Sequence, residues 1–136
     1  MMIVPIAFWF VLLATCAVSW RAGDRGDRRI IVAILATAAI TSVARLFLPF
    51  LDQEMIVLAA NLCLLAIVLR HAMLSSRHWS MWFAGIQAAA CLMMAVALAL
   101  PPGGERAVIA FAAAFWSIPA LLAMAVGLTW DRTEAV

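Results

Sequence analysis

The chain has 136 residues, of which 68% are hydrophobic and 12% charged, and its formal net charge is +2. Soluble domains are about half apolar and about a quarter charged, so too few polar residues remain here to cover a water-soluble core. The composition excludes a soluble fold, and the small net charge excludes the broad basic surface of a nucleic-acid-binding protein.

Five apolar stretches have the length of transmembrane helices, since about 20 helical residues cross a hydrocarbon layer of about 30 Å. They cover residues 3–20, 30–51, 55–74, 80–100 and 107–130. The connections between them are short, which makes sequential helices antiparallel neighbours. The sequence therefore predicts one transmembrane domain over residues 1–136, an all-α integral membrane bundle of about five helices with short loops.

The first loop, residues 21–29, has the densest charge in the chain. Arginines beside helix ends are normally retained on the cytoplasmic side, so this loop indicates topology first. The same residues are a candidate cytoplasmic docking loop for anionic lipid or for a protein partner. They are Arg21, Arg25, Arg28 and Arg29.

The second stretch contains the one charge that the sequence places within the bilayer, Arg45, about six residues before the end of the predicted helix. Thr37, Thr41 and Arg45 follow one another at four-residue spacing, with Ser42 beside them, so they form a polar stripe on one helix face. One interpretation is functional: the stripe lines a path or pocket for an anionic solute or a lipid headgroup.

The other interpretation of Arg45 is structural. Its long side chain can reach the outer interface and pair with Asp52 or Glu54 in the next loop. Asn61, on the third stretch, lies in the same outer half and can hydrogen-bond Arg45 across the turn. We expect a cluster of Arg45, Asp52, Glu54 and Asn61 to fix the packing of a helical hairpin, because every polar group in lipid needs a partner.

The last three stretches each carry a feature that bears on packing. The third has Arg70 and His71 near its end, so it crosses the membrane only if these side chains reach the headgroups, which leaves four or five spans open. On the fourth, we expect Gln87 to make a structural hydrogen bond. The pair Pro101 and Pro102 predicts a sharp stop before the fifth, and Pro119 predicts a bend within it.

The arginines and tryptophans give the orientation. One side of the predicted bundle collects seven arginines, and the loops of the other side contain only Arg106, which places the amino terminus outside and the carboxyl terminus in the cytoplasm. Tryptophans favour the membrane interface and gather at the same ends. The arginines are Arg21, Arg25, Arg28, Arg29, Arg70, Arg77 and Arg132, and the tryptophans are Trp20, Trp79, Trp82 and Trp130.

Acidic residues occur only in the predicted loops and tails. Proton-coupled carriers, di-metal sites and aspartyl intramembrane proteases all need a carboxylate inside the bilayer, so the sequence disfavours these classes. The two histidines lie at the interface and the cysteines are isolated, so we expect no haem, no metal and no other cofactor. The acidic residues are Asp24, Asp27, Asp52, Glu54, Glu105, Asp131 and Glu134.

Three functions fit this pattern. The leading hypothesis is a non-catalytic subunit or accessory of a larger membrane complex, and the alternative is a homo-oligomeric channel or permease for a small or anionic solute. The third is a membrane-surface lipid-modifying enzyme, for which no carboxylate lies near the candidate residues in sequence. Its candidates are His71, Ser75, Ser76 and His78. Arginine without lysine, beside many alanines, indicates a bacterial source and hence the inner membrane.

Overall fold

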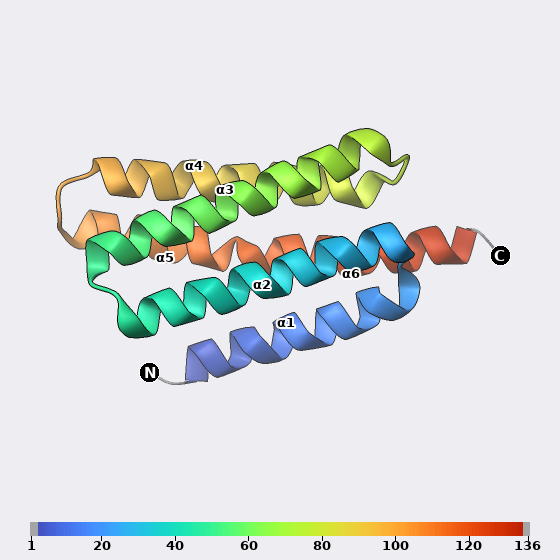
Figure 1. The fold of residues 1–136 in the computed structure, drawn as a ribbon, viewed down its shortest axis with the longest axis horizontal. Coiled ribbons are helices and arrows are strands. Elements are labelled where there is room, and N and C mark those ends of the chain that lie inside the picture. Colours follow the sequence, from blue (N-terminus) through green and yellow to red (C-terminus); the bar gives the residue numbers. More distant parts are fainter. Residues whose placement is uncertain (1–2, 135–136) are drawn as a thin grey trace.

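A computed structural model describes residues 3–134, which form six α-helices and no strand. α5 and α6 continue one another, so this part of the chain makes five antiparallel passes and its two ends lie at opposite ends of the bundle (Figure 1). The helices are α1 (Ile3–Ala22), α2 (Arg25–Phe47), α3 (Phe50–Leu74), α4 (His78–Ala99), α5 (Gly104–Phe115) and α6 (Ser117–Glu134).

Length and composition identify the membrane-spanning elements. Four segments are long and apolar enough to cross a bilayer: Arg25–Phe47, Leu51–Leu74, His78–Ala99 and Gly104–Glu134. The apolar helix Ile6–Ala22 is shorter and runs beside them. The prediction of an all-α membrane bundle is confirmed, and the third stretch, whose crossing the sequence left open, is among the four.

Caps and prolines set the ends of α2, and both ends differ from the prediction. Asp24 accepts hydrogen bonds from the backbone N–H groups of Gly26 and Asp27, and the Asp27 side chain accepts one from the N–H of Asp24. This capping box starts the helix at Arg25, so the predicted loop 21–29 shrinks to two residues. At the other end, Leu48 is extended because Pro49 disfavours the helical conformation before it, and α2 ends at Phe47 rather than at residue 51.

The break between α5 and α6 follows from Pro119. Proline has no N–H to donate to the carbonyl of Phe115, and its ring crowds that carbonyl. α5 accordingly ends at Phe115, Trp116 is a turn, and α6 begins at Ser117. Trp116 keeps helical backbone angles, so Pro119 loosens the last pass at this point without ending it.

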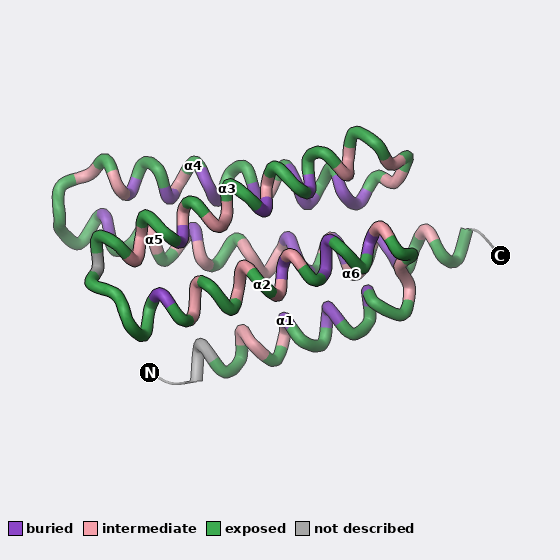
Figure 2. Tube along the Cα trace, viewed as in Figure 1, coloured by how far each residue is buried: buried purple, intermediate pink, exposed green. Residues whose placement is uncertain are grey.

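The five passes close into a ring, with α1 packed on α2 and α6, α3 between α2 and α4, and α4 against α5 and α6. Along each pass buried residues alternate with exposed ones, as Figure 2 shows, and the buried ones pack into two core clusters. The larger core cluster includes Leu12, Ile31, Val68, Phe83, Met124 and Leu128, and a smaller one combines Ala44, Val57, Met94 and Ala113.

One end of the bundle, which we call the arginine-rich end, contains the α1–α2 turn, the α3–α4 connection and the last turns of α6. Arg132 Nη1 donates to the carbonyl oxygen of Arg21 at 3.0 Å, and Arg77 contacts Asp24, so these three segments meet in space. Among the tryptophans of this end, Trp20, Trp82 and Trp130 are exposed, whereas Trp79 is buried in the core.

Candidate functional site at the arginine-rich end

The most buried carboxylate lies where α2, α3 and α4 converge. Asp27 is 1% exposed. Its Oδ1 lies 3.2 Å from Nε2 of His71, on the last turn of α3, and its Oδ2 accepts a 2.6 Å hydrogen bond from Nη1 of Arg77. The sequence placed Asp27 in a loop, and this is corrected: the capping box draws it into the first turn of α2, where it faces the bundle interior.

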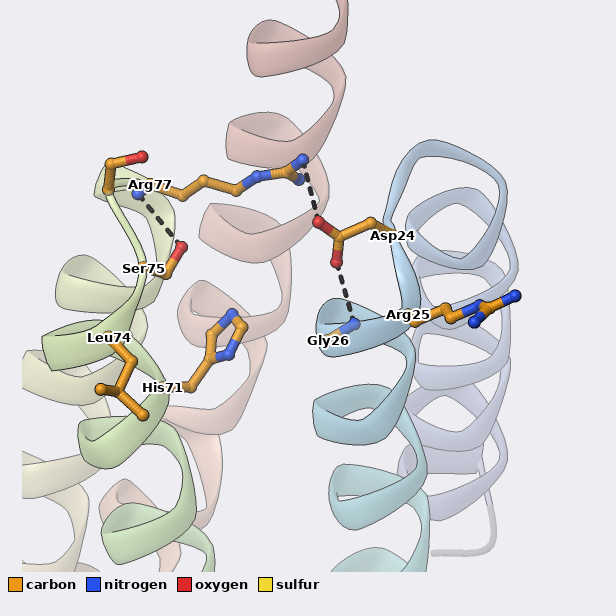
Figure 3. Close-up of a pocket in the computed structure, with 8 residues that line it drawn as sticks. Asp24, Arg25, Gly26, His71, Leu74, Ser75 and Arg77 are labelled. Atoms are coloured by element: carbon orange, nitrogen blue, oxygen red, sulfur yellow. Dashed lines mark hydrogen bonds and ion pairs between the residues drawn. The ribbon is translucent and has the colours of Figure 1, made fainter.

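Asp24 completes the cluster from the outside. Besides capping α2, its carboxylate lies 3.5 Å from Nη2 of Arg77, a contact drawn in Figure 3. Since Nη1 of Arg77 binds Asp27, one guanidinium bridges the two aspartates. The hydrogen bond from the backbone N–H of Asp27, together with the positive charge of Arg77, holds the pKa of Asp24 below its usual value. The α3–α4 connection is thereby fastened to the start of α2.

An open pocket of about 600 Å³ lies over this cluster. Figure 3 shows its two walls, the α2 amino terminus on one side and the end of α3 on the other. Its lining combines acidic, basic and hydroxyl side chains, so its charge does not favour either an anionic or a cationic ligand. Its lining is Asp24, Arg25, Gly26, His71, Leu74, Ser75, Ser76 and Arg77.

The residues proposed for an enzyme lie here, and the structure changes their surroundings. Asp27 supplies His71 with the carboxylate that sequence proximity did not reveal. Ser75 Oγ, however, accepts a hydrogen bond from the backbone N–H of Arg77, and within residues 3–134 no serine hydroxyl is hydrogen-bonded to His71. Ser76 and His78 are exposed. The hydrogen bonds that His71 and Ser75 make connect the ends of α2, α3 and α4.

Arg45 lies elsewhere, at the opposite end of α2. Because Pro49 ends the helix early, Arg45 is exposed and lies two residues from the last helical residue instead of about six. In the described range it makes no ion pair with Asp52 or Glu54. The structure therefore places these three residues near one end of the bundle without joining them.

The hydroxyl side chains of the predicted polar stripe, Thr37, Thr41 and Ser42, are all half-buried. Thr37 Oγ1 donates to the carbonyl oxygen of Ala33 at 2.9 Å, which satisfies the hydroxyl within its own helix. A hydroxyl that is satisfied within its own helix, as that of Thr37 is, needs no solute to explain it.

Asn61 pairs with Gln87 instead of Arg45. Its Nδ2 donates to the carbonyl oxygen of Val57 at 2.8 Å, and its Oδ1 accepts from Gln87 Nε2 at 2.7 Å. Gln87 is 4% exposed, so this hydrogen bond lies inside the bundle and joins α3 to α4. The structure thus gives Gln87 the structural hydrogen bond expected from the sequence, with a partner that the sequence did not identify.

We predict a measurable coupling between Asn61 and Gln87. A double-mutant cycle with Asn61→Ala and Gln87→Ala should give an interaction energy of about 0.5–2 kcal/mol, the range found for side-chain hydrogen bonds between membrane helices. Unfolding by SDS in mixed micelles measures it. Additive single effects would mean that the two amides do not depend on each other.

The four arginines of the candidate docking loop are all exposed but do not form one surface. Arg25 lines the pocket over the ionic cluster, whereas Arg28 and Arg29 line a second hollow on the other side of the α1–α2 turn. Arg21 uses its carbonyl oxygen to accept the bond from Arg132. The loop is two residues long instead of nine, so Arg25, Arg28 and Arg29 lie on α2 and not in one loop with Arg21.

Sequence reasoning missed the cluster of Asp27, His71 and Arg77. One signal was present: two aspartates three residues apart before an apolar helix form a capping-box pattern, which would have placed Asp27 inside the helix. The partners on α3 and α4 had no local signal, because they are 44 and 50 residues away.

No known protein family, curated protein or solved structure matches this chain. The fold and the site define the class of protein to which this chain belongs. It is a membrane-spanning α-helical bundle whose arginine-rich end is held by a buried ionic cluster.

Proposed function

We propose that this chain is a non-catalytic subunit or accessory of a larger assembly in the bacterial inner membrane. One observation carries the proposal: at two places between α2, α3 and α4, polar side chains inside the bundle bind one another. Asp27 is shared by His71 and Arg77, and Asn61 is paired with Gln87. Groups committed to such contacts stabilise helix packing, whereas a catalytic or transport site needs polar groups that reach a substrate.

The outer surface supports a role in assembly. Only 17% of the apolar window of α3 is buried within the bundle, against 39% for α4, so most of α3 is open to lipid or to another chain. Its exposed face is continuous and consists of large apolar side chains. They include Leu51, Met55, Leu62, Leu69 and Met73.

The orientation belongs to the same proposal. The structure brings the α1–α2 turn, the α3–α4 connection and the end of α6 to one end, and seven arginines lie in or beside these segments. Under the positive-inside rule this end faces the cytoplasm and the amino terminus lies outside.

The composition of the native complex tests the proposal. We expect that extraction in a mild detergent, gel filtration and peptide identification will show this chain in a fixed ratio with other polypeptides. A complex that contains this chain alone would contradict the subunit proposal and favour the homo-oligomeric channel. A variant of Arg45 then tests whether such a channel carries anions along this side chain. Arg45→Gln should reduce anion flux into vesicles only if Arg45 lines the path.

A further inference from the structure

A hollow of about 260 Å³ lies on the outside of the α1–α2 hairpin at the arginine-rich end. Its surface is almost entirely apolar and is formed by Trp20, Val32 and the aliphatic parts of Arg28 and Arg29. All four residues are exposed, so the hollow opens away from the bundle core.

Arg28 is held in place within this hollow. Its Nε donates to the carbonyl oxygen of Trp20 at 3.4 Å, and the central carbon of its guanidinium lies 5.2 Å from the centroid of the Trp20 ring. Stacking on an aromatic ring orients a guanidinium and leaves its edge available to an anion. Within the described residues, the two Nη groups of Arg28 donate to no other atom.

The charge of the hollow is not compensated by the chain. The two carboxylates of the same turn, Asp24 and Asp27, bind Arg77, His71 and the backbone of α2. In the part of the chain that the structure describes, neither Arg28 nor Arg29 makes an ion pair. The hollow is therefore an apolar surface whose two lining arginines have no carboxylate partner in the described residues, a combination that suits an anionic group attached to hydrocarbon.

The position of the hollow identifies the kind of anion. The face of α2 that begins at Arg28 continues toward the opposite end as an exposed apolar stripe, which in a membrane is covered by acyl chains. The stripe consists of Val32, Ala36, Ile40 and Val43. A ligand here meets guanidinium groups at its head and hydrocarbon along its length, as the headgroup and chains of a lipid do.

We propose that Trp20, Arg28, Arg29 and Val32 bind the phosphate of an anionic phospholipid, with its acyl chains against the apolar face of α2. A tryptophan at the interface and two arginines beside it place the phosphate at headgroup depth. The inference is independent of the proposed subunit role, since a bound lipid is compatible with a subunit or with a homo-oligomer.

Native mass spectrometry of the full chain released from detergent micelles tests the site. We expect phosphatidylglycerol to bind more tightly than phosphatidylcholine with the same acyl chains. The double variant Arg28→Gln with Arg29→Gln should weaken phosphatidylglycerol binding about tenfold or more, because each arginine near an anionic lipid contributes to affinity. Inorganic phosphate should not compete, since it lacks the acyl chains.

Matched controls separate this site from general charge attraction. Arg25→Gln with Arg70→Gln removes the same charge from the same end outside the hollow and should change binding less than twofold. Trp20→Leu should weaken binding, and Trp82→Leu, at another exposed tryptophan of that end, should not. Equal losses in the two arginine pairs, or unchanged binding in the Arg28 and Arg29 variant, would overturn the proposal. Circular dichroism confirms that each variant is folded.

Discussion

Replacing Asp27 with asparagine should lower the free energy of unfolding by about 2–3 kcal/mol. Removing one partner of a buried ion pair costs about 3–5 kcal/mol, because the remaining charge is left without compensation. Here Arg77 is 30% exposed and His71 19%, so water partly compensates them and the expected cost is smaller. The asparagine also presents an NH₂ group to a guanidinium or an imidazole that had faced an anion.

The neighbouring aspartate provides the control. Asp24→Asn changes the charge by the same amount three residues away, but Asp24 is 63% exposed and its ion pair with Arg77 is long, at 3.5 Å. Asparagine caps helices as well as aspartate does, so this variant should lose no more than about 0.5 kcal/mol. Unfolding by SDS in mixed micelles measures both. If Asp27→Asn were as stable as Asp24→Asn, the buried cluster would not be what holds the three helix ends together.

The sequence predicted the membrane passes because apolar length is a local property. It did not predict where the helices end, since single residues with specific backbone chemistry decide that. Pro49 ends α2 early and leaves Arg45 two residues from the end of its helix. Asp24 extends the same helix at its start and converts a charged loop into a helical turn.

The partners of the polar side chains were harder to predict than the helices. Asn61 and Gln87 meet because α3 and α4 are antiparallel and rotated to present one face to each other, and hydropathy does not give that rotation. Asp27 reaches His71 and Arg77 across three helices in the same way. For Asn61 and Gln87 the sequence identified polar residues that need partners, whereas it placed Asp27 in a loop. In both cases only the packing selected the partners.

The second large effect is expected at Gly127, where α6 crosses α4. A Cβ added there would lie 2.2 Å from Cβ of Trp79 and 3.2 Å from its Cα. The first atoms of a residue are fixed to its backbone, so Trp79 cannot rotate out of the way and the two helices must separate. Small residues at helix contacts in membranes allow this kind of close approach. Gly127→Ala should therefore destabilise the bundle by about 1–3 kcal/mol, the usual cost of overpacking a core.

Gly85, in the interior of α4, gives the opposite expectation for the same substitution. An added Cβ there meets no atom within 4 Å, and the residue is exposed. Alanine has the higher helix propensity, so Gly85→Ala should stabilise the protein by about 0.5–1 kcal/mol. Unfolding of the two variants in the same mixed micelles compares them directly. A Gly127→Ala protein as stable as Gly85→Ala would mean that α4 and α6 do not approach as closely as described, and the ring of helices would need a different closure.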